Sequence, residues 1–176
     1  MSGIRQTGSR TIADVGFTRL DEVTIEAPDG STAIRYALRL ADAVAVVPLD
    51  GDDVVLIEQY RAPIGERLLE IPAGVLDVPG EEPTAAATRE LEEEIGFRPL
   101  SLAHLTDLIT SPGVVDEVIS IYVADGLEAM TRKPEGIEER YAEVHRMPLS
   151  EAIDLVRTGR IRDGKSIVGL LLAGQR

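Results

Sequence analysis

The chain lacks cysteine altogether, which excludes disulfides and thiolate metal ligands and is compatible with a reducing cytosol. Aromatic residues are also scarce, with two Phe, four Tyr and no Trp among 176 residues. The longest apolar run, 167–174, is far too short to cross a bilayer, and residues 1–16 contain no apolar segment typical of a secretory signal. We therefore expect a cytoplasmic protein that does not bind membranes.

Positive charge is in short supply as well. Lys and Arg total 18 against 31 Asp and Glu, which gives a formal net charge of −13. A chain with this much negative charge is poorly suited to binding nucleic acid through its overall electrostatic field. An anionic small molecule could still bind if metal cations or a few placed arginines intervene. The balance of charge therefore favours metal-assisted chemistry.

Apolar patterning and turn signals predict an α/β (α+β) fold, in which a mixed β-sheet is sandwiched between helices and preceded by antiparallel strands. Residues 1–15 are expected to be loosely ordered. The runs 43–49 and 54–60 are uniformly apolar, as in strands buried on both faces. Other strands are expected over 21–27, 32–40, 67–71, 104–110, 118–124 and 141–147, a polar loop over 130–139, and helices from an N-cap at Thr84 to 94, from a cap at Ser150 to 157, and over 165–173.

The predicted helix over 84–94 concentrates glutamate. Its apolar stripe would be Ala87, Leu91 and Ile95. Glu90, Glu93 and Glu94 share a different face, where like charges at this spacing repel each other. Hard cations such as Mg²⁺ or Mn²⁺, which prefer oxygen ligands, would relieve that repulsion. The alternative is a solvated acidic face, which is what most glutamate runs are.

Residues 74–97 resemble the Nudix box, G-x5-E-x7-R-E-U-x-E-E-x-G-U with U apolar. Every position from Glu81 to Phe97 fits, whereas the spacer between Gly74 and Glu81 has six residues rather than five. The resemblance implies a Nudix-type fold and a Mg²⁺ site, with Mn²⁺ as an alternative ion. The metal ligands that it implies are Glu90, Glu93, Glu94 and the carbonyl of Ala73, and its structural residues are Gly74, Glu81, Arg89 and Gly96.

The resemblance also implies hydrolysis of a diphosphate joined to a second group. Such chemistry needs a carboxylate that takes a proton from the attacking water. In many members this base lies on a mobile loop outside the box, so Glu138 and Glu139 are candidates alongside Glu93. The alternative is that residues 134–140 form an ordinary acidic solvent loop.

Features outside the box resemble the ADP-ribose pyrophosphatase branch of the family. They are the segment 54–61 (VVLIEQYR), the segment 70–74 (EIPAG) and Pro112, fifteen residues after the box. The branch cleaves ADP-ribose to AMP and ribose 5-phosphate. Arg61 would grip a phosphate, although a surface arginine at a strand end fits its position equally well. The two histidines are isolated, and neither is given a catalytic role.

The N-terminal strands imply a homodimer by the same resemblance. We take residues 1–40 as the dimerisation segment and 41–176 as the hydrolase core. Phe17 and Arg35 would sandwich adenine in the partner subunit's site.

Other functions stay open at this point. The substrate could be another nucleotide sugar, such as an ADP-sugar or GDP-mannose. The chain could instead be a sensor that binds ADP-ribose without cleaving it, or an acidic interaction protein with no ligand. The intact box argues against the last two.

Overall fold

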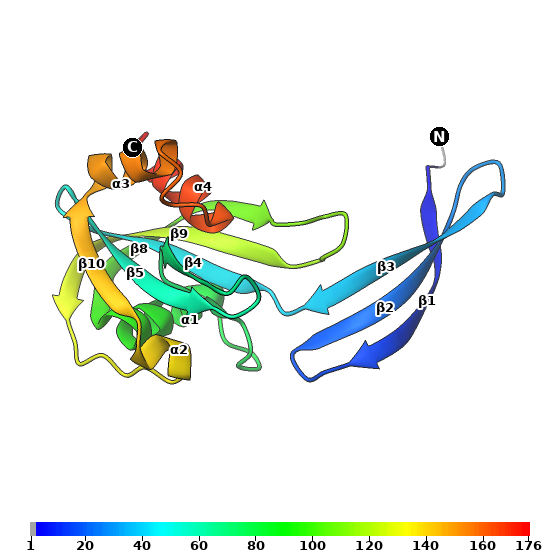
Figure 1. The fold of residues 1–176 in the computed structure, drawn as a ribbon, viewed down its shortest axis with the longest axis horizontal. Coiled ribbons are helices and arrows are strands. Elements are labelled where there is room, and N and C mark those ends of the chain that lie inside the picture. Colours follow the sequence, from blue (N-terminus) through cyan, green and yellow to red (C-terminus); the bar gives the residue numbers. More distant parts are fainter. Residues whose placement is uncertain (1–2) are drawn as a thin grey trace. The chain divides into compact units, whose positions relative to one another are not determined.

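The computed structural model describes residues 3–176, which divide into two compact units (Figure 1). The first unit consists of the chain up to Asp42 together with Ile109–Val118. The second consists of Ala43–Leu108 and Ile119–Arg176. No helix in this described part of the chain is both long and apolar enough to cross a membrane.

The first unit is built on a three-stranded antiparallel sheet in the order β1-β2-β3. The strands are β1 (Arg5–Asp14), β2 (Thr18–Glu26) and β3 (Thr32–Leu40). The prediction that residues 1–15 are loosely ordered is therefore wrong for the ten residues of β1. This strand buries none of its side chains and is held by backbone pairing with β2 from Arg5↔Glu26 to Asp14↔Arg19. Such pairing leaves no apolar pattern in the sequence.

The second unit contains a seven-stranded sheet in the order β10-β5-β4-β9-β8, in which β6 also pairs with β5 and β7 with β4. Strand β4 is parallel to β9 and antiparallel to β5, so the sheet is mixed, as predicted. Its strands are β4 (Ala43–Asp50), β5 (Asp53–Arg61), β6 (Glu66–Glu70), β7 (Ala73–Val75), β8 (Phe97–Ile109), β9 (Val118–Ala129) and β10 (Glu143–Pro148).

Both faces of this sheet are covered (Figure 1). Ala45 and Val47 of β4 pack with α3 (Leu149–Arg157) and α4 (Gly164–Ala173) on one face. Val44 and Val46 of the same strand pack with the helix that carries the glutamates on the other face. The two-sided burial of the central strands and the sandwich of sheet and helices are therefore confirmed.

The glutamate helix has two parts, α1 (Pro83–Glu90) and the π-helical turn η1 (Leu91–Ile95). It ends at Gly96, as predicted, because φ of 72° at this residue suits glycine. The predicted N-cap at Thr84 is wrong. Glu82 occupies that position, since proline is well suited to the first helical position that follows it.

Three other boundaries differ from the sequence predictions. Strands β8 and β9 extend beyond the expected 104–110 and 118–124. Ser150 lies inside α3, which begins one residue earlier. A short helix, α2 (Ile137–Arg140), interrupts the predicted polar loop.

Candidate active site

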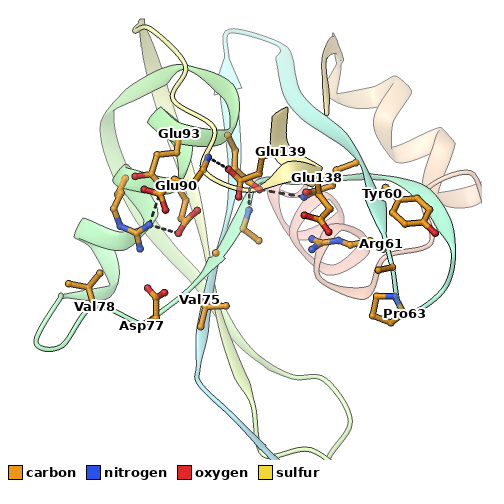
Figure 2. A pocket seen from close by; sticks show the side chains of 17 residues that line it. Tyr60, Arg61, Pro63, Val75, Asp77, Val78, Glu90, Glu93, Glu138 and Glu139 are labelled. Atoms are coloured by element: carbon orange, nitrogen blue, oxygen red, sulfur yellow. Dashed lines mark hydrogen bonds and ion pairs between the residues drawn. The ribbon is translucent and has the colours of Figure 1, made fainter. Parts of the chain in front are cut away.

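A cavity of about 530 Å³ lies in the second unit, beside the glutamate helix (Figure 2). Four segments meet there: the end of β5, the chain from β7 into the following loop, the helix, and the loop that contains α2. They contribute residues 59–63, Ala73, Gly74, Val75, Asp77, Val78, Arg89, Glu90, Glu93, Glu94, Glu135, Glu138 and Glu139.

Glu94 lies at the bottom of this cavity with only 3% of its surface exposed. One carboxylate oxygen accepts a hydrogen bond from the Ala73 N–H at 2.9 Å, and the other accepts one from the Gln59 amide at 3.4 Å. Burial raises the pKa of Glu94 to about 8, because the lost hydration outweighs the opposing effects of the Ala73 hydrogen bond and the charge of Arg61. Gln59 belongs to the segment 54–61, but no pattern in the sequence predicts that it lies at the site.

Glu90 lies directly against the backbone of Gly74. A Cβ atom at position 74 would lie 1.9 Å from the carboxyl carbon of Glu90, so only glycine leaves room for this carboxylate. Burial, assisted by the charge of Glu93, raises the pKa of Glu90 to about 7, although the neighbouring Arg89 opposes the shift. The first glycine of the motif is thus explained by the close approach of a side chain.

Arg89 organises the acidic side chains from one edge. Its guanidinium binds both carboxylate oxygens of Glu81 at 3.1 Å, and its Nη1 donates to Glu90 at 2.7 Å and to Glu93 at 3.2 Å. Burial also raises the pKa of Glu93. Glu92 pairs with Arg98 at 2.6 Å and does not line the cavity.

The acidic side chains suit a divalent metal. Glu90, Glu93 and Glu94 offer oxygen donors to one cavity, as Mg²⁺ requires, and Ala73 lies beside them. Two of these carboxylates are buried with raised pKa values, and a bound cation would favour their charged forms. The metal ligands and the roles of Gly74, Glu81, Arg89 and Gly96 stay predictions.

A second group of possible ligands lies outside the cavity. The ligand atoms of Glu58, Glu143 and His145 lie within 4.8 Å of one another. Arginines already neutralise this group, however: Arg160 contacts Glu58 at 2.5 Å, and Arg67 contacts Glu143 at 3.1 Å. None of the three residues in this group lines the cavity.

The structure distinguishes the two glutamates proposed as bases. One carboxylate oxygen of Glu139 accepts a hydrogen bond from the Glu135 N–H at 2.8 Å, which folds this side chain back onto its own loop. The Glu138 side chain makes no hydrogen bond to any residue in the range 3–176. Both line the cavity, across from Glu90 and Glu93 (Figure 2).

Arg61 lines the cavity and is held by a buried ionic network. Its Nε and Nη2 donate to Glu70 at 2.8 and 2.7 Å. The fully buried Glu70 also pairs with Lys165, which contacts Asp163 at 3.0 Å, and Asp163 caps α4 through the Ser166 N–H. This network was not predicted from the sequence. A lysine in the first turn of an apolar helix, two residues after an aspartate, was the available signal.

Phe17 and Arg35 belong to the first unit and are not among the residues that line the cavity. Phe17 is 86% exposed, and Arg35 donates to the carbonyl of its neighbour Ile34. Asp116 of the first unit binds Arg39 at 2.9 Å and accepts a hydrogen bond from the Leu40 N–H, so its carboxylate is engaged within that unit.

Comparison with known proteins places this site in a family. A model of the NUDIX domain matches residues 39–168. A solved structure described as an ADP compounds hydrolase superposes with a TM-score of 0.87 and 26% identity, covering 99% of this chain and 94% of that one. The chain therefore belongs to the Nudix family, and the predicted membership and fold are confirmed.

Three curated relatives show which functions occur among similar chains. The methanol dehydrogenase activator of Bacillus methanolicus is 37% identical over 83% of this chain and 79% of its own length. The ADP-ribose pyrophosphatase of Bacillus subtilis is 36% identical over 81% and 77%. The ADP-ribose pyrophosphatase of Mycobacterium tuberculosis is 38% identical over 87% and 73%.

Proposed function

We propose that the chain is a metal-dependent hydrolase that cleaves the diphosphate of ADP-ribose to AMP and ribose 5-phosphate. The observation that carries the proposal is the cavity itself, where Glu90, Glu93 and Glu94 face an arginine held at the opposite edge. The relatives named as ADP-ribose pyrophosphatases support the choice of substrate. The overall acidity of the chain argues against nucleic acid as a partner, and its lack of cysteine is in keeping with the cytoplasm.

The cation in this proposal is Mg²⁺, with Mn²⁺ as an alternative, held by Glu90, Glu93, Glu94 and Ala73. When bound, it would neutralise phosphate charge and make a water molecule more acidic. Arg89 keeps Glu90 and Glu93 in place through its bonds to both. Glu94 is fixed by Ala73 and Gln59, so its carboxylate needs little rearrangement to act as a ligand.

Arg61 holds a phosphate group of the substrate. Its Nε and Nη2 are engaged by Glu70, which leaves Nη1 as the donor group with no hydrogen bond to any residue in the range 3–176. Lys165 shares the negative charge of Glu70, so the arginine is not fully neutralised by its partner. An arginine fixed in this way meets a phosphate without losing side-chain freedom on binding.

Glu138 is the base that we propose. It takes a proton from water as the water oxygen bonds to phosphorus and the bond from phosphorus to the bridging oxygen breaks. Its carboxylate is free to do so, whereas that of Glu139 is engaged by the Glu135 N–H. We expect Glu138→Gln to lower kcat by about 10²-fold or more and Glu139→Gln by much less. Equal losses in the two variants, or a larger loss in Glu139→Gln, would reject this assignment.

The reaction is tested by AMP formation from ADP-ribose with added Mg²⁺, with EDTA as the control. Specificity constants for a panel that includes ADP-sugars and GDP-mannose decide the substrate. A preference for a guanine nucleotide sugar would replace ADP-ribose, and tight binding of ADP-ribose without turnover would identify a sensor.

We also propose a homodimer that forms through the first unit. Among the described residues of this unit, Val23 is the only hydrophobic residue whose side chain is buried. Eight large apolar side chains of this unit are instead exposed: Ile4, Ile12, Val15, Phe17, Ile34, Tyr36, Ile109 and Val114. A second copy of the chain would cover such a surface.

The dimer is tested by introducing a charge into the exposed apolar surface. We expect Ile34→Glu to sediment as a monomer, whereas Ile34→Val, which keeps the surface apolar, stays dimeric. A monomeric wild-type chain at micromolar concentration would refute the assembly but not the reaction.

A further inference from the structure

The guanidinium of Arg132 lies among three backbone carbonyls from three segments of the second unit. Its Nε donates to the carbonyl of Glu94 at 2.5 Å, and its Nη2 donates to that of Glu139 at 2.6 Å. Its Nη1 donates to the carbonyl of Ala142 at 3.2 Å. One arginine thus joins the end of the glutamate helix, the end of α2 and the chain just before β10.

The position of Arg132 is set by the end of the helix. The Met130 N–H donates to the Gly96 carbonyl at 2.8 Å, and the α-carbon face of Gly96 lies so close to Arg132 that a Cβ there would be 3.3 Å from its backbone nitrogen. Carbonyls at a helix C-terminus carry partial negative charge and favour a cation. The helix end therefore provides both the place and the charge for this guanidinium.

The turn α2 has few other ties to the second unit: it packs against β5, and the Tyr141 carbonyl directly after it accepts a hydrogen bond from Arg67 at 3.2 Å. It has four residues, none of them buried, and so short a helix is not stable by itself. The Glu139 carboxylate only ties the turn to its own loop, through Glu135. The bonds from Arg132 are the ones that connect the turn to the helix carrying Glu90 and Glu94.

We infer that Arg132 is a positioning residue, which holds the turn bearing Glu138 at a fixed place relative to the carboxylates of Glu90 and Glu94. The inference rests on the proposed function. Arg132 does not line the cavity, and all its hydrogen bonds go to backbone carbonyls, so it acts through Glu138 rather than on the substrate. Lysine cannot replace it fully. The guanidinium is a rigid, planar group whose donors reach three carbonyls at once, whereas a single ammonium group is too compact to reach all three.

The first test compares Arg132→Gln with Arg140→Gln. Arg140 is exposed on the same turn and its side chain makes no hydrogen bond within residues 3–176, so it controls for the loss of charge. We expect Arg132→Gln to lower kcat by about 10- to 100-fold, since small displacements of a reacting group have effects of this size. KM and the thermal stabilisation by Mg²⁺ should stay at their wild-type values. Arg140→Gln should keep wild-type kcat.

Two further variants separate positioning from general destabilisation. Arg132→Lys keeps the charge and one carbonyl contact, and we expect a kcat between those of the wild type and Arg132→Gln. In Arg132→Ala, added guanidinium at millimolar concentration should restore part of the lost kcat, whereas sodium chloride at equal ionic strength should not. If Arg132→Gln does not fold, Arg132→Lys and the rescue experiment still test whether Arg132 positions the turn.

Hydrogen exchange of the backbone amides gives a readout that does not depend on activity. In Arg132→Gln, the amides of residues 138–142 should exchange faster while those of β4 and β5 are unchanged. Wild-type exchange in this segment together with wild-type kcat overturns the inference. If the wild-type protein does not cleave ADP-ribose, the proposed function fails, and faster exchange at 138–142 alone still tests whether Arg132 holds the turn.

Discussion

The two units each bury a carboxylate almost completely, Asp21 in the first and Glu94 in the second, but they surround it in opposite ways. Asp21 is 4% exposed and binds Arg19 and Arg39, each at 3.1 Å, as well as the hydroxyl of Thr11. Glu94 receives only the Ala73 N–H and the Gln59 amide, with no ion pair to any residue in the range 3–176. Burial raises the pKa of both groups, yet the partners of Asp21 reverse the shift and lower it.

Under the proposed function, this difference separates a carboxylate with a structural role from one that binds a metal. The protein neutralises Asp21 with its own arginines, and within the second unit it treats Glu70 in the same way through Arg61 and Lys165. Glu94, by contrast, lines the cavity and forms no ion pair to any residue in the range 3–176. A cation bound in the cavity would stabilise the charged form of this buried carboxylate.

Removing the uncompensated carboxylate should have the largest effect. We expect Glu94→Gln to lower kcat by about a thousandfold, since metal assistance contributes several kcal/mol to such reactions. The thermal stabilisation by Mg²⁺ should be lost as well. Glu92→Gln is the matched control, because Glu92 is on the same helix but pairs with Arg98. Full turnover in a folded Glu94→Gln variant would mean that the metal assignment is wrong.

Features of the site that arise within one continuous segment could be predicted from the sequence, whereas contacts between residues far apart in the sequence could not. The box is continuous, so the shared face of Glu90, Glu93 and Glu94 follows from helical periodicity. The ion pair of Glu70 with Lys165 joins residues 95 positions apart and leaves no local pattern. The compensation that distinguishes Asp21 from Glu94 is equally invisible, because it depends on which arginines the folded chain brings near.

The fold shows the same division. Strands β4 and β5 were predictable because burial on both faces makes them uniformly apolar. Strand β1 was not, because its side chains are exposed and its order comes from hydrogen bonds to β2.

The same glycine substitution in each unit should sharpen the comparison. In Gly74→Ala the new methyl group would displace the Glu90 carboxylate, which can swing away because it ends a flexible side chain. We expect Mg²⁺ affinity to fall by about 10- to 100-fold with little change in the melting temperature. In Gly8→Ala the methyl group meets Thr24 at 3.8 Å, an ordinary contact, and Mg²⁺ affinity should not change. The Mg²⁺ affinity of each variant is measured by titration, with the melting temperature as the readout. Equal affinities in the two variants would contradict this account of Gly74.

The opposite pKa shifts predict opposite responses to pH. Glu90 and Glu94 have folded pKa values of about 7 and 8, above the ordinary 4.5, so their contribution to stability is complete below pH 4.5 and lost as pH rises through 7 to 8. The pKa of Asp21 is lowered, so its contribution is lost only as pH falls below the ordinary 3.8. In EDTA, the melting temperature should therefore decrease between pH 5.5 and 8.5.

Added Mg²⁺ should remove this decrease, with its largest effect at the alkaline end, where the carboxylates are ionised. Glu94→Gln should show a shallower slope in EDTA. Asp21→Asn should lower the melting temperature by the same amount throughout the range from pH 5.5 to 8.5. An EDTA profile that is flat in the wild type would show that the buried glutamates do not govern the stability of the metal-free protein.

The smallest effects should come from the exposed residues of the first unit. If Phe17 and Arg35 contact adenine in the partner's site, Phe17→Ala and Arg35→Ala should each raise KM for ADP-ribose by about three- to tenfold, the value of one aromatic or cation–π contact. The kcat should not change, because adenine lies far from the reacting phosphorus and is bound equally in the ground and transition states. Val15→Ala, which alters an exposed apolar residue near Phe17, is the control.

Product inhibition is the most specific test of whether Phe17 and Arg35 contact adenine. AMP carries the adenine and ribose 5-phosphate does not, so both variants should weaken inhibition by AMP and leave inhibition by ribose 5-phosphate unchanged. The monomeric Ile34→Glu variant should show the same loss, because the partner's contacts are absent. If KM and AMP inhibition are unchanged, adenine is recognised within the second unit alone, where Tyr60 is the aromatic residue that lines the cavity. The first unit would then serve assembly only, and the contrast between the two units would be complete.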